Sequence, residues 1–284
     1  MKALIVGGDG MLGHVAKLYL EERGHEVRAT SRNVGSDYKF DATKNLEYVE
    51  GFIDDFSPDA VINCIGILNK VAEENKALAV QINSYLPHFL DELCAEKGVK
   101  FVHVSTDCVF EGDNDGGYTE DSPKDATSFY GRSKALGEIQ NDTNLTLRTS
   151  IVGPDQNEKG IGLFQWFMNQ KGETSGFDQV YWTGVTTIQL AKAIEVAIAK
   201  NLSGLRHVAN GDKIDKYSLL ELFKKHFKKP ITINRKSDYA SDKSIICITD
   251  FDFGVPSYDQ MVREMGEWVM SHKGLYTPSQ WVAQ

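Results

Sequence analysis

Two residues four positions apart, Tyr130 and Lys134, could transfer a proton to or from an oxygen atom. Residues at this spacing lie on the same face of a helix. Because an ammonium group stabilises a neighbouring phenolate, we expect Lys134 to lower the pKa of Tyr130 from its reference value of about 10. The phenol could then exchange a proton with a carbonyl or carbinol oxygen near neutral pH. The pair predicts acid–base chemistry at a carbon–oxygen bond.

Two hydroxyl side chains, Ser105 and Thr106, follow the apolar run at residues 100–104. That run is typical of a buried strand, and ligands of parallel sheets bind at the carboxyl ends of the strands. A hydroxyl group there can donate a hydrogen bond to a substrate oxygen as negative charge develops on it. We therefore expect Thr106 to act together with Tyr130 and Lys134.

Three glycines, Gly7, Gly10 and Gly13, come directly after the apolar run at residues 2–6 and overlap the start of a helical pattern at 11–23. Gly7 would permit a tight turn, and Gly10 would let a pyrophosphate approach the start of the helix. Gly13 would let that helix pack closely on the sheet. A glycine triplet alone is a weak signal, but its place between strand and helix predicts a dinucleotide-binding loop.

The residues at the end of the second expected strand bear on the choice of cofactor. Thr30, Ser31 and Arg32 stand where an acidic residue would hold the ribose 2′-hydroxyl of NADH. Hydroxyl groups and a guanidinium suit a 2′-phosphate, so we expect NADPH, although Arg32 could also be an ordinary surface arginine. Asp41 could bind the adenine amino group or cap the next helix.

Strand and helix patterns alternate through the first half of the chain. Strands are expected at residues 2–6, 25–30, 37–40, 59–64, 100–105, 145–148, 205–209 and 231–233. Helices are expected at 11–23, 44–56, 72–97 with a kink at Pro87, from 128, and at 161–170, 186–200, 217–228 and 256–270. This order predicts an α/β fold, a Rossmann-type doubly wound parallel sheet with a smaller C-terminal substrate lobe.

The division between sheet domain and lobe follows from the same pattern. We expect residues 1–152 together with about 180–210 to form the dinucleotide-binding domain. Residues of about 153–179 together with 211–284 would form the substrate lobe. A polar loop from Asp107 to about Ala126 separates the fifth strand from the helix that carries Tyr130.

Composition and charge narrow the class of protein. The net charge of −9 argues against a nucleic-acid partner. The basic cluster at residues 224–229 resembles a solvated helix end, with a phosphate or nucleic-acid patch as the alternative. The four cysteines lack metal-ligand spacing, so we expect no metal site and a reducing compartment. Neither a signal peptide nor a membrane span is apparent, which predicts a soluble cytoplasmic protein.

Longer motifs around these residues resemble a known family. The glycine spacing, Ser105–Asp107 and Tyr130-x-x-x-Lys134 are similar to the extended short-chain dehydrogenase/reductases. The strings at 104–112, 130–138 and 147–150 resemble the dTDP-4-dehydrorhamnose reductase family, which reduces 4-keto-6-deoxy nucleotide sugars with NADPH. The resemblance extends over residues 1 to about 155.

The resemblance implies roles for residues that match the family motifs. It implies a catalytic triad of Thr106, Tyr130 and Lys134, and a substrate site of Thr106, Asp107, Cys108 and Tyr130. The expected cofactor-binding residues are Gly7, Gly10, Met11, Leu12, Gly13, Ser31, Arg32, Asp41, Cys64, Ile65, Gly66, Tyr130 and Lys134. It further implies NADPH (NADP) as cofactor, a nucleotide-sugar substrate for surface polysaccharide synthesis, and a homodimer.

Some residues depart from the family pattern. Cys108 and Ile151 stand where the family usually has aromatic residues, which puts the substrate dTDP-4-dehydrorhamnose in doubt. Residues 163–167 and 175–177 resemble a subgroup that reduces UDP-linked 2-acetamido-2,6-dideoxyhexos-4-uloses; Trp166 and Phe167 could equally be core residues of the lobe. Two alternatives stay open: an epimerase or dehydratase of the same superfamily, and a non-catalytic NADP-binding regulatory subunit.

Overall fold

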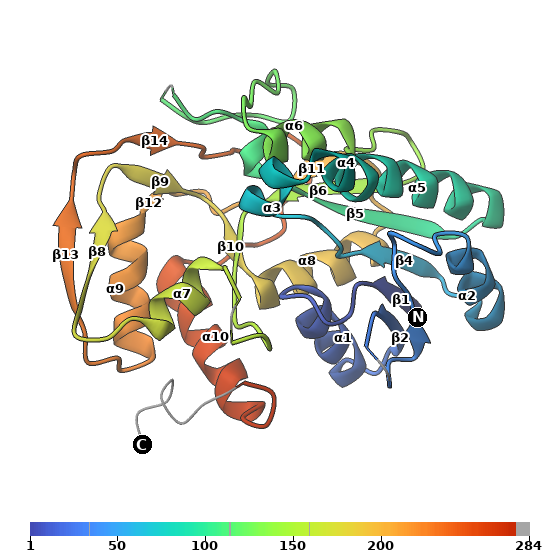
Figure 1. Cartoon of the computed structure of the whole chain (residues 1–284), viewed down its shortest axis with the longest axis horizontal. Helices are drawn as coiled ribbons and strands as arrows, with labels where there is room; N and C mark the ends of the chain where they lie inside the picture. The colour runs from blue at the N-terminus through green and yellow to red at the C-terminus, as the bar shows by residue number, and fades with distance from the viewer. Residues whose placement is uncertain (34, 114, 159, 277–284) are drawn as a thin grey trace.

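A parallel sheet of seven strands forms the centre of the molecule, in the order β3-β2-β1-β4-β5-β6-β11 (Figure 1). The computed structural model describes residues 1–33, 35–113, 115–158 and 160–276. The strands of the sheet are β1 (Lys2–Val6), β2 (Glu26–Ser31), β3 (Tyr38–Lys39), β4 (Ala60–Asn63), β5 (Lys100–Thr106), β6 (Leu145–Thr149) and β11 (Gly204–His207). Every neighbouring pair is parallel, which confirms the predicted doubly wound fold.

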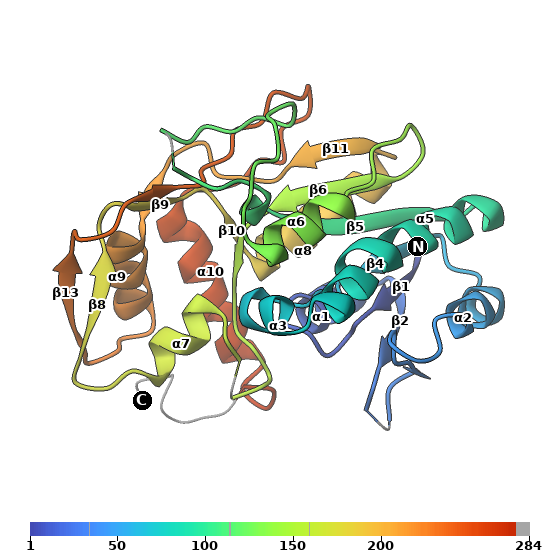
Figure 2. The same cartoon turned by 45° about the horizontal axis from the view of Figure 1, so that its top comes forward.

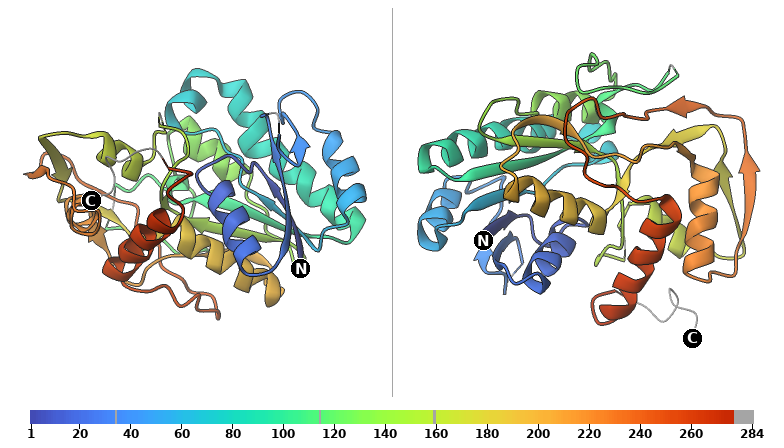
Figure 3. Two further views of the ribbon diagram at one scale, coloured as in Figure 1. Left: turned by 90° about the horizontal axis from the view of Figure 1, so that it is seen from below. Right: turned by 180° about the vertical axis from the view of Figure 1, so that it is seen from behind.

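Helices cover both faces of this sheet. One face packs on α1 (Gly13–Glu22) and α8 (Thr187–Ala199), which lie side by side in Figure 3. The other face packs on α2 (Tyr48–Phe56) and α5 (Leu86–Lys97), with α6 (Phe129–Leu136) beside them. Neighbouring residues of β1 enter different cores, since side chains alternate along a strand.

The segment expected as one helix at 72–97 is broken, so that prediction was wrong. It forms α3 (Asn69–Glu74), α4 (Lys76–Ala79), a π-helical stretch (Val80–Tyr85) and then α5. The break falls at Asn75, which has a non-helical φ of −133° and caps α4 by accepting from Leu78 N. The π-helical stretch immediately precedes α5, in whose first turn Pro87 lies.

The remaining elements form a smaller lobe at one end of the sheet (Figure 2). Its helices are α7 (Leu163–Asn169), α9 (Lys216–His226) and α10 (Tyr258–Ser271). Its short strands, most of which the sequence did not predict, are β8 (Glu173–Phe177), β9 (Val180–Trp182), β12 (Ile214–Asp215), β13 (Thr232–Lys236) and β14 (Ser241–Asp242). Strands β7 (Ile151–Val152) and β10 (Val185–Thr186) pair with each other between lobe and sheet.

One continuous apolar core joins the lobe to the sheet. Phe164 of α7, Phe223 of α9 and Met265 of α10 are fully buried and belong to the same cluster as Ile5 and Leu147 of the sheet. The burial of such side chains is the main stabilising contribution to a fold. The two parts therefore share their core, and the predicted residue boundaries between them stay a prediction.

The basic cluster at residues 224–229 lies at the end of α9, as predicted. Lys225 and His226 both contact Asp259 of α10, at 2.6 and 2.9 Å. Lys229 donates to the carbonyl of Met168. These side chains therefore join α9 to its neighbours. Within the described residues, no helix has both the length and the apolar character needed to cross a membrane.

Candidate active site at the carboxyl edge of the sheet

Tyr130 lies in the first turn of α6, and three contacts fix the start of that helix. Ser128 caps it by accepting from Gly131 N at 3.1 Å, as its position before the helix predicts. Glu73 of α3 accepts from the backbone N–H groups of Phe129 and Tyr130. A carboxylate at this end also interacts favourably with the helix dipole. The phenol is thus carried by a helix start that is held from two sides.

Tyr130 and Thr106 come together at the end of β5. Each side chain is only 8% exposed, and a hydrogen bond with Thr106 acts on the phenol of Tyr130. Thr106 Oγ1 also accepts from Cys108 N at 3.1 Å, which fixes the rotation of the hydroxyl-bearing side chain. The structure therefore places two of the three predicted catalytic groups beside one another.

Lys134 lies one turn further along α6 and is 4% exposed. Its Nζ donates to the carbonyl of Val104 at 2.7 Å and lies 3.2 Å from His103 Nε2. Burial lowers the pKa of Lys134 to about 8. Both contacts lie on β5, directly behind the site formed by Thr106.

The expected effect of Lys134 on Tyr130 differs from what the chain shows. Burial raises the pKa of Tyr130, and the hydrogen bond with Thr106 only partly opposes that rise. Lys134 donates a hydrogen bond to Val104 O and lies against His103 Nε2, and both contacts are with β5 instead of the phenol. The prediction of a lowered pKa is therefore wrong for this structure, because desolvation outweighs the effects that favour the phenolate. The phenol keeps its proton at neutral pH.

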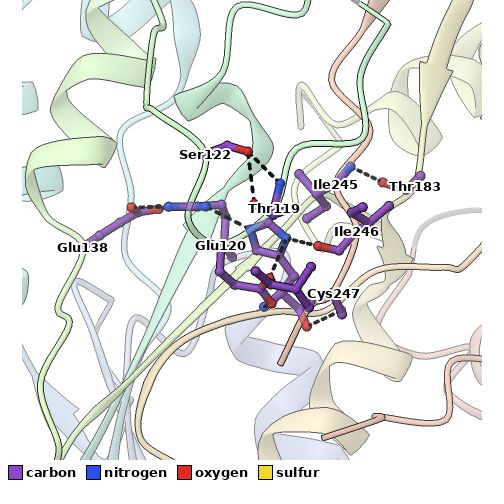
Figure 4. A network of polar contacts seen from close by, with 11 residues as sticks. Thr119, Glu120, Ser122, Glu138, Thr183, Ile245, Ile246 and Cys247 are labelled. Atoms are coloured by element: carbon purple, nitrogen blue, oxygen red, sulfur yellow. Dashed lines mark hydrogen bonds and ion pairs between the residues drawn. The ribbon is translucent and has the colours of Figure 1, made fainter. Parts of the chain in front are cut away.

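A buried polar network includes Glu138 and Glu120, which Figure 4 labels, and begins at Ser105. Ser105 Oγ donates to Glu138 at 2.7 Å, and Glu138 forms a two-pronged ion pair with Arg148 at 2.7 and 2.8 Å. Arg148 in turn lies 2.9 Å from His207 Nε2, and Glu120 accepts from His207 N. The network joins β5, β6, β11 and the polar loop, so it holds the end of β5 in place.

The two residues after Thr106, Asp107 and Cys108, begin a short 3-10 turn. Burial raises the pKa of Asp107, and Lys216 of the lobe opposes that rise. Burial and the neighbouring Asp107 raise the pKa of the Cys108 thiol to about 12. Cys108 therefore presents a neutral thiol, which argues against a role as nucleophile.

The glycine loop between β1 and α1 has the predicted shape. Gly7 has a φ of +97°, and its N–H donates to Thr30 Oγ1 at 3.1 Å. A Cβ at Gly13 would lie 2.0 Å from Gly7 O, so only glycine fits there. A Cβ at Gly10 would have no atom nearer than 3.5 Å, which leaves room above the helix start. Packing thus requires glycine at Gly13 and not at Gly10, and a pyrophosphate site at the N-terminus of α1 stays a prediction.

The end of β2 differs in one respect from the predicted phosphate site. Arg32 is exposed and makes no hydrogen bond or ion pair with any described residue. Ser31, however, donates to the carboxylate of Asp9 in the glycine loop, and Asn33 Nδ2 donates to the same carboxylate. Asp9 was not predicted, and its negative charge lies beside the hydroxyl that we expected to bind a phosphate.

Asp41 caps a local turn and does not cap α2. Its Oδ1 accepts from Thr43 N at 3.0 Å and Thr43 Oγ1 at 2.7 Å. Those hydrogen bonds, together with Lys44, lower the pKa of Asp41. Because α2 begins only at Tyr48, the predicted helix cap is wrong, and a contact with adenine stays a prediction.

The turn after β4 is held by two asparagines. Asn63 Oδ1 accepts from Ile65 N at 3.1 Å. Asn83, in the π-helical stretch, accepts from Ile67 N and donates to Ile67 O and to Ser133 of α6. Asn83 was not predicted, and it connects this turn with the helix of Tyr130. π-Helical segments of this kind are frequent at functional sites.

The other residues expected near the cofactor occupy different environments. Leu12 is buried in the core beneath α1, and Gly66 is exposed. Met11 faces the lobe: its Sδ would lie 3.1 Å from a Cβ at Gly162. Cys64 is half-buried, and burial raises the pKa of its thiol to about 12. The roles of these residues toward a cofactor stay predictions.

Three residues of the lobe, Trp166 and Phe167 of α7 and Lys216 of α9, also bear on the predictions from the sequence. Phe167 is fully buried, as the core alternative predicts, whereas Trp166 is 40% exposed. Lys216 was not predicted as a site residue. Its ammonium group interacts electrostatically with Asp107 and Cys108. Its position after Asp215 could have revealed it, because a lysine at the start of a helix opposes the helix dipole.

Comparisons with known proteins agree with this geometry. The model of the RmlD substrate binding domain family matches residues 1–240. The "Probable dTDP-4,6-dihydroxy-2-methyloxan-3-one 4-ketoreductase" of Streptomyces antibioticus is 36% identical over 236 residues, 78% of this chain and 75% of that protein. The "Probable low-salt glycan biosynthesis reductase Agl14" of Haloferax volcanii is 33% identical over 178 residues, which cover 58% of this chain and 59% of that protein.

A solved structure has the same fold. The dTDP-4-dehydrorhamnose reductase of Bacillus anthracis, in complex with NADP, is 21% identical and has a TM-score of 0.79. The match covers 93% of this chain and 98% of that one. The family match covers most of the chain, including the glycine loop, Thr106, Tyr130 and Lys134. The chain therefore belongs to the RmlD substrate-binding-domain family.

Proposed function

We propose that this protein reduces the C4 ketone of a nucleotide-linked 4-keto-6-deoxyhexose with NADPH. The observation that carries the proposal is the position of two buried hydroxyl groups, Tyr130 and Thr106, beside each other at the carboxyl end of β5. A protonated phenol and a fixed hydroxyl are the groups needed to activate a ketone oxygen. The names of the Streptomyces and Bacillus relatives, both reductases of dTDP-linked sugars, support this class of reaction.

The residues of the glycine loop fit a dinucleotide. The absence of side chains at Gly10 and Gly13, the second of which packs tightly on Gly7 O, would let a pyrophosphate approach the start of α1. Arg32, an exposed guanidinium with no described partner, is suited to a 2′-phosphate. Lys134 would hold the nicotinamide ribose. When bound, the reduced nicotinamide supplies a hydride to the carbon of the ketone.

Thr106 and Tyr130 are the residues that act on the ketone oxygen. Thr106 donates a hydrogen bond to this oxygen and polarises the carbonyl. Tyr130, which keeps its proton because burial raises its pKa, transfers that proton to the oxygen as the alcohol forms. Lys134, one turn further along α6, would supply a positive charge on the same helix face as the resulting phenolate. Glu138, through Ser105, keeps the end of β5 in register with α6.

The substrate is a sugar nucleotide whose product serves glycan assembly. The name of the Haloferax relative, a glycan biosynthesis reductase, supports this role. Cys108 and Ile151, both smaller than the aromatic residues expected there, leave more room beside the sugar than the family pattern does. That room favours a larger substituent on the ring, such as the acetamido group of a UDP-linked 2-acetamido-2,6-dideoxyhexos-4-ulose. The homodimer stays a prediction.

The test is an assay of NADPH oxidation with purified protein and dTDP- and UDP-linked 4-keto-6-deoxyhexoses. A reductase consumes one NADPH for each sugar reduced. An epimerase or dehydratase would convert the sugar without net consumption of cofactor. A regulatory subunit would bind NADPH and leave all these sugars unchanged, and either of these results would overturn the proposal.

A further inference from the structure

Lys216 occupies an unfavourable position at the start of α9. Asp215 caps this helix by accepting from Ser218 N at 2.8 Å, and Lys216 is the first helical residue. A cation in the first turn opposes the helix dipole, which favours negative charge there. Where a chain breaks a local rule of this kind, the reason is often functional.

The surroundings of Lys216 place it at the edge of the candidate active site. Its Nζ lies 5.0 Å from the centre of the Trp182 ring, which packs beneath it. The ionisable groups that act on it are Asp107 and Cys108, the two residues after Thr106. Protein surrounds the ammonium closely enough to lower the pKa of Lys216 to about 8. The side chain nevertheless keeps part of its surface accessible to solvent.

The ammonium of Lys216 makes no hydrogen bond or ion pair with any described residue. Two lysines near it differ in this respect. Lys134, which is more deeply buried, donates to Val104 O, and Lys213, three residues earlier, contacts Asp242 and Asp115 O. An enclosed cation whose partner is an aromatic face still lacks acceptors for its N–H groups, which is costly unless a ligand supplies them. Lys216 therefore offers donors with no described acceptor close to Asp107 and Cys108, the residues that follow Thr106.

We propose that Lys216 binds an oxygen atom on the sugar ring of the substrate, near the carbon that is reduced. This inference rests on the proposed function and names the part of the substrate that the lobe recognises. The neighbours of Lys216 directly follow Thr106, which places the ammonium at the sugar end of the site. Asp107 accepts hydrogen bonds and Lys216 donates them, so the two together suit a ring hydroxyl or an acetamido oxygen.

The experiment compares Lys216→Met with Lys216→Arg and with the control Lys213→Met. Equilibrium binding to the NADP-loaded protein is measured by calorimetry for dTDP-rhamnose and dTDP, and for UDP-2-acetamido-2,6-dideoxyhexose and UDP. We expect K216M to bind the preferred nucleotide sugar about 10- to 100-fold more weakly, the usual effect of losing a charged hydrogen bond. Binding of the free nucleotide is unchanged, K216R recovers part of the loss, and K213M matches the wild type.

Thermal unfolding separates a binding role from a structural one. Because K216M removes an unpaired cation from a helix start, we expect its Tm to equal or exceed that of the wild type, by about 1 to 3 °C. If K216M binds the nucleotide sugar as tightly as the wild type, the proposal is overturned. If K216M loses equal affinity for the free nucleotide, Lys216 binds the diphosphate and not the sugar, which also overturns it. A failed proposed function would show itself differently, as wild-type protein that oxidises no NADPH.

Discussion

The Nζ of Lys134 lies 3.2 Å from Nε2 of His103, and both side chains are buried. On the other side of the imidazole, Asn63 Nδ2 lies 3.2 Å from Nδ1. The amide oxygen of Asn63 already accepts from Ile65 N, so its NH₂ group faces the ring and donates to Nδ1. A neutral His103 therefore carries its own proton on Nε2, toward Lys134. This arrangement disfavours the ammonium form of Lys134.

The pH dependence of stability tests this relationship. Burial lowers the pKa of Lys134 from 10.5 to about 8, so between these values the unfolded chain binds a proton that the folded chain lacks. The free-energy cost of burying the charged form of Lys134 is complete below pH 8 and disappears as the pH rises toward 10.5. This residue therefore makes the free energy of unfolding increase with pH over that range. We expect the Lys134→Met variant to lose this increase in urea unfolding at pH 7.5 and 9.5. Identical pH slopes for variant and wild type would refute the lowered pKa.

Glu138 and Arg148 form a buried ion pair whose side chains are 2% and 1% exposed. Its contribution to stability can be tested by substitution. We expect Glu138→Gln to cost about 3 to 5 kcal/mol of unfolding free energy, because it leaves the guanidinium buried without its counter-charge. Denaturant unfolding measures this loss. The double variant E138Q/R148M should be less destabilised than the sum of the single changes, and simple additivity would contradict the account.

Because the pKa of Glu138 is lowered, the stabilising effect of the same ion pair depends on pH. Hydrogen bonds and charge from Arg148 lower its pKa despite burial. Its stabilising contribution is therefore complete above the unfolded value near 4.5 and is lost as the pH falls below it. Wild-type stability should drop more steeply in acid than that of E138Q, and parallel acid titrations would count against this role.

The cofactor preference depends on two opposing charges at the end of β2. Arg32→Ala should weaken NADPH binding about 10-fold and leave NADH binding nearly unchanged, because only NADPH carries the 2′-phosphate. Asp9→Asn should act in the opposite direction and strengthen NADPH binding, since the carboxylate beside Ser31 repels a phosphate. Fluorescence titration of both cofactors measures the ratio. A preference for NADH in the wild type would overturn the assignment of Arg32.

The glycine loop gives a prediction with a matched control. Gly13→Ala should abolish cofactor binding and destabilise the fold, because its Cβ would lie 2.0 Å from Gly7 O. Gly51→Ala on the exposed part of α2 meets no atom within 4 Å and should be neutral or stabilising by about 0.5 to 1 kcal/mol. Normal NADPH affinity in G13A would show that the loop is not the pyrophosphate site.

The sequence predicts those parts of the molecule that depend on local rules. The glycine loop, the cap at Ser128 and the alternation of buried strands with amphipathic helices each involve residues close in the chain. Tyr130, Lys134 and Thr106 could be proposed as a group because strand ends in a parallel sheet share one edge. Their convergence at the end of β5 follows from the fold that these patterns specify.

Other features depend on contacts between residues far apart in the chain. Asn75 breaks a helix that the apolar pattern continues through, because its side chain caps the next turn. The short strands β12 and β14 each pair with β9, from which whole helices and strands separate them in the chain, and they lack a pattern of their own. The raised pKa of Tyr130, which packs against Ala72 and Ala79, and the lowered pKa of Lys216 are likewise set by burial. No local spacing encodes such desolvation.

The central claim, that Tyr130 gives its proton to the ketone oxygen, is tested most directly by Tyr130→Phe. The rate of NADPH oxidation is measured with the preferred 4-keto-6-deoxy nucleotide sugar, and NADPH affinity is measured separately. The control variant is Tyr19→Phe, because the Tyr19 hydroxyl donates to Glu195 of α8. We predict that Y130F binds NADPH normally and loses about 10²- to 10⁴-fold in kcat, while Y19F keeps wild-type turnover. Turnover of Y130F within tenfold of the wild type would contradict the account.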